Sequence, residues 1–354
     1  MADFEHVVVL SDGIRGHYHQ AVGVANWLRK LGGVQLDPAI NVPIFQGFQK
    51  LLHMKFFVRN LDSEDPAYPR NWLKSTGVRF RKFAPGTLFI SAGGQAAPYC
   101  LAFAKATKNK CCCIMTPSVL GTKPFDFAII PSHDKHDPRD KNIFVTLGAP
   151  NHICPPELDE VSQAFFGDQE FHTSKVVGVA IGGGDANYRI TPRWVEDVLA
   201  PLRYVDDATI LITTSRRSGP AVDAAVEKVF ADAPTVGRML LMSRKPGMSL
   251  LSAMFGRATH VIATEDSISI VSESITAGFK VGLMRVDKTT GSFKKMLGYG
   301  YPRFDATFDE MIKRGLVQDL GELPNFDRFL EPPEQKHGLD FSEARRAAEW
   351  ILSH

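Results

Sequence analysis

Short apolar runs recur along the chain, and each is followed by a loop rich in Gly, Ser or Thr and then by a stretch with helical spacing. Apolar runs that alternate with helices in this way predict the buried strands of a parallel, doubly wound sheet. In the first half of the chain, the predicted strands are residues 6–10, 35–42, 87–91, 111–116, 127–131 and 144–147, and the clearest helices are residues 20–30 and 98–108.

The pattern breaks at residues 155–175, which carry a Pro-Pro pair, acidic residues and no strong period, as expected of an interdomain linker. It restarts with predicted strands at 176–181, 209–213, 238–242, 260–263 and 281–284. A single core rarely grows beyond roughly 250 to 300 residues, so a chain of this length favours two domains. We expect a first domain at 1–160, a second at 174–335, and an amphipathic last helix within 340–354 that crosses back to the first domain.

The composition is that of a folded globular protein, with 44% hydrophobic and 23% charged residues. The N-terminal residues lack the pattern of a signal peptide, and no run reaches ~18 apolar residues, so we expect a cytoplasmic protein. A net charge of +2 gives little support for nucleic-acid binding. Five cysteines, three of them consecutive at 111–113, fit neither a disulfide framework nor zinc spacing and predict buried, reduced thiols.

The loops after the strands carry the candidate chemistry, since open α/β sheets bind ligands at the carboxyl ends of their strands. In the first loop, Gly13 and Gly16 allow the backbone to approach a ligand closely. His17 is the first choice as a general base, with His19 and Asp12 as the alternatives. The competing interpretation is a tight turn with a satisfied histidine.

Two loops of the second half have the composition of phosphate or sugar sites. Residues 182–187 contain three consecutive glycines followed by an acid, and the candidates there are Gly183, Gly184 and Asp185. Residues 213–218 combine hydroxyl groups with two guanidinium groups, which suits phosphate oxygens, and the candidates are Thr214, Ser215, Arg216 and Arg217. The alternative for this second loop is a solvated helix start.

The loop after residues 260–263 places hydroxyl groups at a helix N-terminus, where anions are favoured. The candidates for phosphate contact there are Asp266, Ser267 and Ser269. Glu273 lies further along the same predicted helix, with a carboxylate that can accept hydrogen bonds from ribose hydroxyls. A capping box would explain the start of this motif but would not account for Glu273.

At this motif the chain resembles glycosyltransferases of the GT-B type. Residues 258–283 resemble the nucleotide-binding segment of the UDP-GlcNAc transferase that makes the peptidoglycan lipid precursor, with Ser-Glu and Ala-Gly pairs at the same spacing. The resemblance implies that Glu273 binds the ribose and that the loop at 243–248, with Arg244 and Met248, holds the base. The residues that match this family's N-terminal glycine-rich loop are Gly13, Gly16, His17 and Ala21.

A second resemblance covers nearly the whole chain, to the bacterial and plant family named for mitochondrial fission in plants, the "elongated mitochondria" proteins. Its motifs here are SDGIRGHYHQAVGVA, ISAGGQAAP, PSHDKHD, VTLGAPN, IGGGDANYR, TTSRRS and TEDSISIVSES. Gln95 departs from this pattern, because we expect Arg at that position of an AGR-type motif. Together the resemblances imply an α/β protein of GT-B architecture, with two Rossmann-like domains whose parallel sheets face a central cleft and a C-terminal helix that crosses back to the first domain.

Other enzyme classes fit less well. A nicotinamide enzyme would carry G-x-G-x-x-G after the first strand, and the chain has G-x-x-G-H there. A short-chain epimerase would need a Tyr followed four positions later by Lys, and none of the seven tyrosines satisfies that spacing. The main alternative to an enzyme is a non-catalytic GT-B scaffold that acts by partner binding in membrane or organelle division, as the fission role of plant relatives implies.

One stretch bears on the acceptor. Between Lys50 and Lys82, eight Lys and Arg residues against three acids give a local balance of +5, and aromatic residues are interleaved with them. The cations are Lys50, Lys55, Arg59, Arg70, Lys74, Arg79, Arg81 and Lys82. Such a stretch suits an anionic membrane surface, at ~1 kcal/mol per cation near the surface, and the alternative is an ordinary basic helix face.

The sequence therefore predicts transfer of a sugar from a nucleotide-diphosphate donor, of UDP type, to an acceptor hydroxyl. The second domain would hold the donor, and the first would supply the base. Arginines and helix N-termini would stabilise the departing diphosphate, so neither a metal nor another cofactor is expected. A lipid-linked or membrane-associated acceptor would place the protein on the inner face of the membrane.

Overall fold

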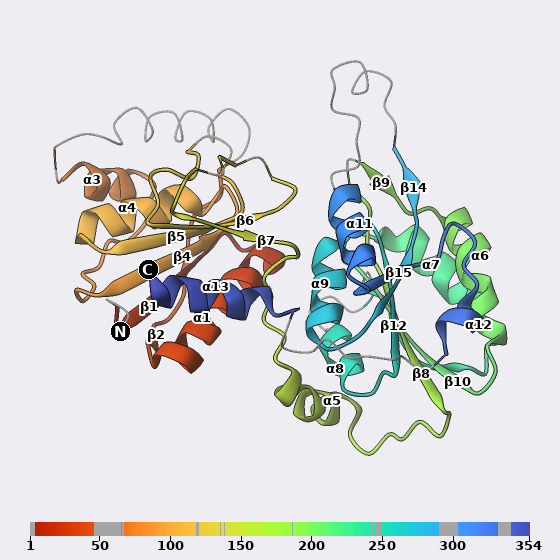
Figure 1. The fold of residues 1–354 in the computed structure, drawn as a ribbon. Coiled ribbons are helices and arrows are strands. Elements are labelled where there is room, and N and C mark those ends of the chain that lie inside the picture. The colour runs from red at the N-terminus through yellow and green to blue at the C-terminus, as the bar shows by residue number, and fades with distance from the viewer. Residues whose placement is uncertain are drawn as a thin grey trace. The chain divides into compact units, whose positions relative to one another are not determined.

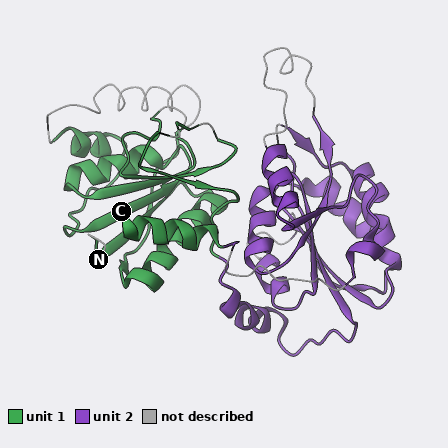
Figure 2. Ribbon diagram, viewed as in Figure 1, with its two compact units in different colours: residues 1–152, 342–354 green, residues 153–341 purple. Residues whose placement is uncertain are grey.

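The computed structural model describes residues 4–45, 65, 67–117, 120–134, 136–137, 139–185, 187–242, 244, 250–289, 304–331 and 341–354. The chain forms two compact units, shown separately in Figure 2. Unit 1 comprises Met1–His152 and Ser342–His354, and unit 2 comprises Ile153–Phe341.

Unit 1 is built on a parallel sheet whose strands follow the order β2-β1-β4-β5-β6-β7, with β3 also paired to β1 (Figure 1). Its described strands are β1 (His6–Ser11), β2 (Gln35–Leu36), β3 (Ile40–Asn41), β4 (Thr87–Ala92), β5 (Lys110–Ile114), β6 (Phe127–Pro131) and β7 (Ile143–Thr146). Its described helices are α1 (Arg15–Gly32), α3 (Tyr68–Ser75), α4 (Ala97–Thr107) and α13 (Glu343–Ser353).

Successive side chains of a strand point to opposite faces, which divides the core of unit 1 in two. Val8 and Leu10 of β1 belong to the cluster that contains residues of α3 and α4. Val7 and Val9 belong to the cluster that contains residues of α1 and α13. Because both faces are covered, β1 is apolar along nearly its whole length, as is typical of strands in parallel sheets.

Unit 2 has a second parallel sheet, in the order β11-β10-β8-β12-β13-β15. Its strands are β8 (Lys175–Ile181), β10 (Ala208–Thr214), β11 (Val236–Leu240), β12 (His260–Thr264), β13 (Val281–Met284) and β15 (Val317–Asp319). A separate antiparallel pair is formed by β9 (Tyr188–Arg189) and β14 (Asp287–Lys288).

Helices cover both faces of this sheet, with α6 against α7 on one face and α8 and α9 on the other (Figure 1). The described helical segments are η1 (Pro155–Glu157), α5 (Leu158–Phe166), α6 (Pro192–Leu199), η2 (Ala200–Tyr204), α7 (Gly219–Phe230), α8 (Leu251–Phe255), α9 (Ile268–Thr276), α11 (Asp305–Lys313) and α12 (Phe326–Phe329).

Three features differ from the sequence-based expectations. The segment 155–175, expected as a linker, lies in unit 2 and contains α5, which buries Leu158 and Phe166 and contacts α8. The expected strand at 35–42 is two short strands, because Pro38 in its middle has no N–H to donate to a ladder. The short strand β15 was not predicted, since its sequence Val-Gln-Asp carries no apolar run.

The C-terminal helix α13 belongs to unit 1, as the sequence predicts, and packs on α1. Its first residue, Glu343, is buried and accepts a hydrogen bond of 3.1 Å from the backbone N–H of Leu147. The cysteines at 111–113 and Cys100 are buried free thiols, and burial raises the pKa of Cys100 to about 12. Within the described part of the chain, no helix has both the length and the apolar character needed to cross a bilayer.

Candidate functional site

The loop after β1 is organised around a buried carboxylate. Asp12 is 1% exposed, and its Oδ1 accepts the backbone N–H of Ile14 at 3.1 Å. Its Oδ2 lies 2.8 Å from Nδ1 of His17, in the first turn of α1. The loop is closed further by Gly13, whose N–H donates to the Ser11 hydroxyl at 3.1 Å.

His17 is held in one orientation from two sides. Asp12 binds Nδ1, and Gly93, after β4, lies against the ring so closely that a Cβ there would come within 2.5 Å of Nδ1 and Cε1. The His17 side chain is still 25% exposed. When Nδ1–H donates to Asp12, the free lone pair is on Nε2, which is the arrangement of an oriented general base.

The alternative histidine, His19, has different surroundings. Its ring lies 4.1 Å, centroid to centroid, from the ring of His152. Burial lowers the pKa of His152, and the positive charge of Arg15 lowers it further. On the same helix, Gly23 lies against the residue before His152, because a Cβ there would come within 2.1 Å of the carbonyl oxygen of Asn151. His19 is therefore packed into a ring pair, whereas His17 is held by a carboxylate. Gly16 is an exposed residue of α1, and no atom of the described residues lies within 4 Å of a Cβ placed there.

In unit 2, the glycine-rich loop after β8 is bound by a carboxylate from the loop after β12. Oδ2 of Asp266 accepts the N–H of Gly183 at 2.8 Å and that of Gly184 at 2.7 Å. Asp266 is 2% exposed, and burial raises its pKa against the opposing hydrogen bonds from Thr264 and the Gly184 N–H. The neighbouring Asp185 is exposed and accepts the N–H groups of Asn187 and Tyr188, which closes the following turn.

The loop after β10 contributes both structural and exposed groups. Thr214 is buried and accepts the N–H of Met242 at 2.9 Å. Ser215 accepts the N–H of Arg217, whose guanidinium donates to the carbonyl oxygen of Gly184 at 3.0 Å. Arg216 is exposed. Of the two arginines, Arg217 therefore joins two loops, while Arg216 presents its charge to solvent.

The residues expected to hold the base are only partly described. Arg244 forms an exposed ion pair with Glu227 of α7, whose hydrogen bond raises the pKa of the guanidinium above its ordinary value. Met248 lies outside the described residues. The ion pair ties the start of this loop to α7.

The start of α9 lacks a side-chain cap. Ser267 stands at the N-cap position, and its hydroxyl makes no capping hydrogen bond, so the capping-box interpretation does not apply. The first turn of a helix leaves backbone N–H groups without intrahelical acceptors, and Ser269 lies in this turn, partly exposed. Glu273 follows on the same helix, 9% exposed.

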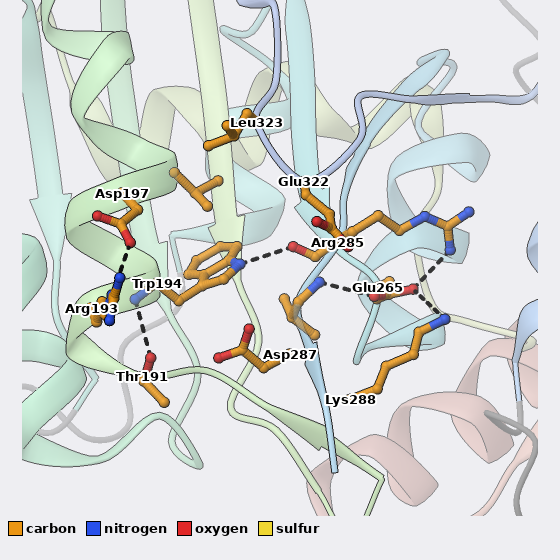
Figure 3. Close-up of a pocket in the computed structure, with 12 residues that line it drawn as sticks. Thr191, Arg193, Trp194, Asp197, Glu265, Arg285, Asp287, Lys288, Glu322 and Leu323 are labelled. Carbon is orange, nitrogen blue, oxygen red and sulfur yellow. Dashed lines mark hydrogen bonds and ion pairs between the residues drawn. The ribbon is translucent and has the colours of Figure 1, made fainter. Parts of the chain in front are cut away.

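A cavity of about 780 Å³ opens in unit 2 between α6 and the segment that follows β13 (Figure 3). Glu265, fully buried, binds Nη1 of Arg285 at 2.8 Å and the N–H of Val286 at 2.9 Å. Trp194 donates its indole N–H to the carbonyl oxygen of Arg285 at 2.9 Å. Among the residues that the structure describes, none of those singled out above for nucleotide contact lines this cavity.

Arg285 is the centre of this wall. Burial disfavours its charge, but hydrogen bonds to Asp319 and Glu265 outweigh that effect and raise the pKa of the guanidinium above its ordinary value. Sequence reasoning missed this group, although one signal was present. Arg285 directly follows the apolar strand β13, at the edge where α/β sheets place their functional side chains.

The basic stretch is described only in part, because Lys50, Lys55 and Arg59 lie outside the described residues. Arg79, Arg81 and Lys82 are exposed. The nearby rings of Phe80 and Phe83 are half-buried and pack against Phe103. In the described part, this surface is therefore cationic, and the aromatic side chains Phe80 and Phe83 are partly buried against the core.

Several solved structures share this fold over nearly the full chain. The S. aureus MnaA-UDP co-structure has 11% identity and a TM-score of 0.50, with 99% of this chain and 96% of that chain covered. The UDP-GlcNAc 2-epimerase from Neisseria meningitidis bound to UDP-GlcNAc has 12% identity and a TM-score of 0.51, with 98% of each chain covered. The glycosyltransferase SnogD from Streptomyces nogalater has 14% identity and a TM-score of 0.46, with 99% and 94% covered.

At these identities the likeness concerns the fold alone, an α/β fold of GT-B architecture that the UDP-GlcNAc 2-epimerase shares. Among epimerases, the sequence was compared only with the short-chain type, so the likeness to a UDP-GlcNAc 2-epimerase was not predicted. No curated protein sequence matches the chain. The sequence model described as Mitochondrial fission ELM1 matches residues 15–354, and the chain belongs to this family.

Proposed function

We propose that the chain binds a nucleoside-diphosphate sugar through unit 2. The observation that carries this proposal is the construction of α9, which combines an uncapped N-terminus with a nearly buried carboxylate on the same helix. The N-terminal N–H groups and the Ser267 and Ser269 hydroxyls would bind the diphosphate. Glu273 would accept hydrogen bonds from the ribose.

The charges support this assignment. A helix N-terminus carries roughly half a positive charge, and an anion there gains about 0.3 to 1 kcal/mol at an exposed site. Arg216 adds a full positive charge at the end of β10. Hydrogen bonds to a charged carboxylate contribute about 1.5 to 3 kcal/mol, so Glu273 would supply a large share of nucleoside affinity.

The structural relatives support UDP as the nucleotide. One is described as a complex with UDP and another as a complex with UDP-GlcNAc, and both share the fold over nearly the whole chain. We therefore take UDP as the nucleotide and UDP-GlcNAc as the first sugar donor to test.

Unit 1 would supply the base for transfer to an acceptor hydroxyl. His17 is the group for this role, because Asp12 holds Nδ1 and leaves Nε2 to accept the proton. The α9 N-terminus and Arg216 would stabilise the departing diphosphate, which requires no metal ion.

The acceptor proposal rests on charge. The exposed Arg79, Arg81 and Lys82 suit an anionic membrane surface, which would bring the protein to a lipid-linked acceptor. Since the rings of Phe80 and Phe83 beside them are partly buried against the core, we propose that attraction to lipid is mainly electrostatic.

The alternative is a GT-B scaffold that acts by partner binding in membrane or organelle division, which the family description favours. The His17–Asp12 pair favours an enzyme, because a scaffold has no need of a buried carboxylate that orients a partly exposed imidazole. Both versions share a nucleotide-binding unit 2, and they differ in whether a bound sugar nucleotide is consumed.

Thermal unfolding of the whole chain with a panel of nucleotides tests the proposal. A ligand at ~100 times its dissociation constant adds about 2.7 kcal/mol to the free energy of unfolding. We expect UDP and UDP-GlcNAc to raise the melting temperature more than the same concentrations of uridine, adenosine diphosphate or inorganic pyrophosphate. Equal melting temperatures throughout the panel would contradict the proposal.

A further inference from the structure

The glycine-rich loop after β8 has the sequence of a phosphate-binding loop, yet its polar groups already have protein partners. Gly183 and Gly184 donate their N–H groups to Oδ2 of Asp266, at 2.8 and 2.7 Å. Gly182 donates its N–H to the Thr264 hydroxyl at 2.7 Å. The three consecutive N–H donors are therefore all used inside unit 2.

The carbonyl oxygens of this loop are bound as well. Gly182 accepts a hydrogen bond of 2.6 Å from the Ser218 hydroxyl, and Gly184 accepts one of 3.0 Å from Arg217. These contacts join the loops that follow β8, β10 and β12, which are adjacent strands of the sheet. Asp266 is thus part of a connection between three strand ends.

Packing gives an independent reason for the glycines. A Cβ at Gly182 would lie 2.2 Å from both carboxylate oxygens of Asp266, and one at Gly183 would lie 2.3 Å from Cβ of Arg217. Real Cβ atoms are not found at such separations from other heavy atoms. The glycines are required because Asp266 and Arg217 approach the backbone, and no ligand is needed to explain them.

Consecutive backbone N–H groups form a concave site that favours an anion, and phosphate is its common occupant. Here the anion is a side chain of the protein itself. We propose that Asp266 is an internal anion that occupies the glycine-rich loop in place of a phosphate and so excludes the donor's diphosphate from it. The diphosphate is then left to the α9 N-terminus and Arg216, and the Asp266 charge lowers the affinity for it.

This inference deepens the proposed nucleotide function and rests on it in one respect only, the effect on UDP affinity. The occupation of the loop by an anion can be tested without any nucleotide. One experiment can therefore contradict the occupation of the loop by Asp266, and a different experiment can contradict the effect of Asp266 on UDP affinity.

The first experiment uses the vacated loop. Asp266→Ala removes the carboxylate and leaves two N–H donors without an acceptor, so it lowers the melting temperature. Sodium formate should restore the melting temperature in a concentration-dependent way, whereas formamide and sodium chloride at equal ionic strength should not. In calorimetry, inorganic phosphate should bind the variant more tightly than it binds the parent. Equal responses to formate and formamide would overturn the proposal.

The second experiment keeps the loop intact and also decides the question if Asp266→Ala does not fold. In Asp266→Asn, the amide oxygen can still accept both N–H groups, but the negative charge is gone. UDP should bind this variant more tightly than the parent, on the order of tenfold. A purely structural role would leave the affinity unchanged, and a direct contact between Asp266 and the nucleotide would weaken it, so either result would overturn the proposal.

Glu196→Gln is the matched control, because it removes one negative charge from an exposed residue of α6 that pairs with Lys228. It changes the net charge equally and should leave UDP affinity within about twofold of the parent. If neither parent nor variant binds UDP, the proposed function fails, and the formate experiment still decides the occupation of the loop.

Discussion

Each unit contains a buried aspartate in the loop after a strand, and the two have opposite consequences. In unit 1, Asp12 follows β1 and holds the ring of His17, whose side chain stays 25% exposed. In unit 2, Asp266 follows β12 and holds the backbone N–H groups of Gly183 and Gly184. The first carboxylate leaves an oriented, partly exposed imidazole, which we propose as the base, whereas the second, as we propose, fills a site that would otherwise attract an anion.

The difference shows that residue type and position at a strand end do not define a role. Both carboxylates are at most 2% exposed, and both are bound by donors from their surroundings. What distinguishes them is the donor, because an imidazole has a second nitrogen to offer and a backbone N–H has none. The roles that we propose for the two aspartates therefore differ because the groups that they bind differ.

The largest effect is expected from removing the proposed base in unit 1, His17. His17→Ala should slow the release of UDP from UDP-GlcNAc, with water as the simplest acceptor, by 10²- to 10⁴-fold, as is typical for loss of a general base. UDP affinity should not change, since the donor residues belong to unit 2. Tyr18→Ala, at an exposed neighbouring position of α1, is the control. UDP release at the parental rate in His17→Ala would assign the histidine to structure.

Charge reversal in unit 1 should separate membrane binding from donor binding. With Arg79, Arg81 and Lys82 all changed to Glu, binding to phosphatidylglycerol vesicles should fall by at least ~10²-fold, given about 1 kcal/mol for each cation at the surface. Sedimentation with anionic and neutral vesicles measures this, and added salt should release the parent protein. Equal sedimentation of parent and variant would leave a soluble acceptor as the better interpretation.

The orientation of His17 can be disturbed without changing a polar group. Gly93 has φ +81° and lies against the His17 ring, whereas Gly77 has φ +80° and no atom of the described residues within 4 Å of a Cβ placed there. Alanine at either position should cost about 1 to 2 kcal/mol of backbone strain. Only Gly93→Ala should also reduce the rate of UDP release and alter its pH profile. The same activity in both variants would show that Gly93 does not position the ring.

The smallest effect concerns pH and Asp266. Burial raises the pKa of this carboxyl in the folded chain above its value in the unfolded chain. Its contribution to the free energy of unfolding is therefore fully present below the unfolded pKa and is lost as pH rises through the folded pKa. Asp266→Asn cannot ionise and should lack this decrease. Urea unfolding of both proteins at pH 4 and pH 7 gives the comparison. A parent that gains stability relative to the variant between these pH values would contradict the raised pKa.

Much of the fold could be predicted because strands covered on both faces are continuous apolar runs. Strand β13, Val281–Met284, is such a run and was predicted with the same bounds. Strand β15, Val317–Asp319, contains no apolar run, since a three-residue edge strand needs few apolar side chains. Local pattern also could not reveal that residues 155–175 form part of a folded unit, because α5 is stabilised by its contact with α8.

The site was harder to predict, since its central contacts join distant residues. The loops that carry the candidate functional residues were predicted from glycines, hydroxyl groups and charges at strand ends. The bond between Asp266 and Gly183 crosses 83 positions, and no spacing in the sequence indicates it. Glycines that serve packing and glycines that serve a ligand have the same sequence pattern. Only the position of the Asp266 carboxylate in the fold distinguishes the two kinds of glycine.

The central claim, that α9 forms the nucleotide site of unit 2, is tested most directly by calorimetric titration of UDP into the parent, Glu273→Ala and Ser274→Ala. Ser274 is the control, because its buried hydroxyl donates to the carbonyl oxygen of Ile270 within the same helix. We predict that UDP binds the parent and Ser274→Ala with similar affinity. Binding to Glu273→Ala should be weaker by about 1.5 to 3 kcal/mol, the contribution of a hydrogen bond to a charged group. Equal affinity of all three proteins, or no binding by the parent, would contradict the account.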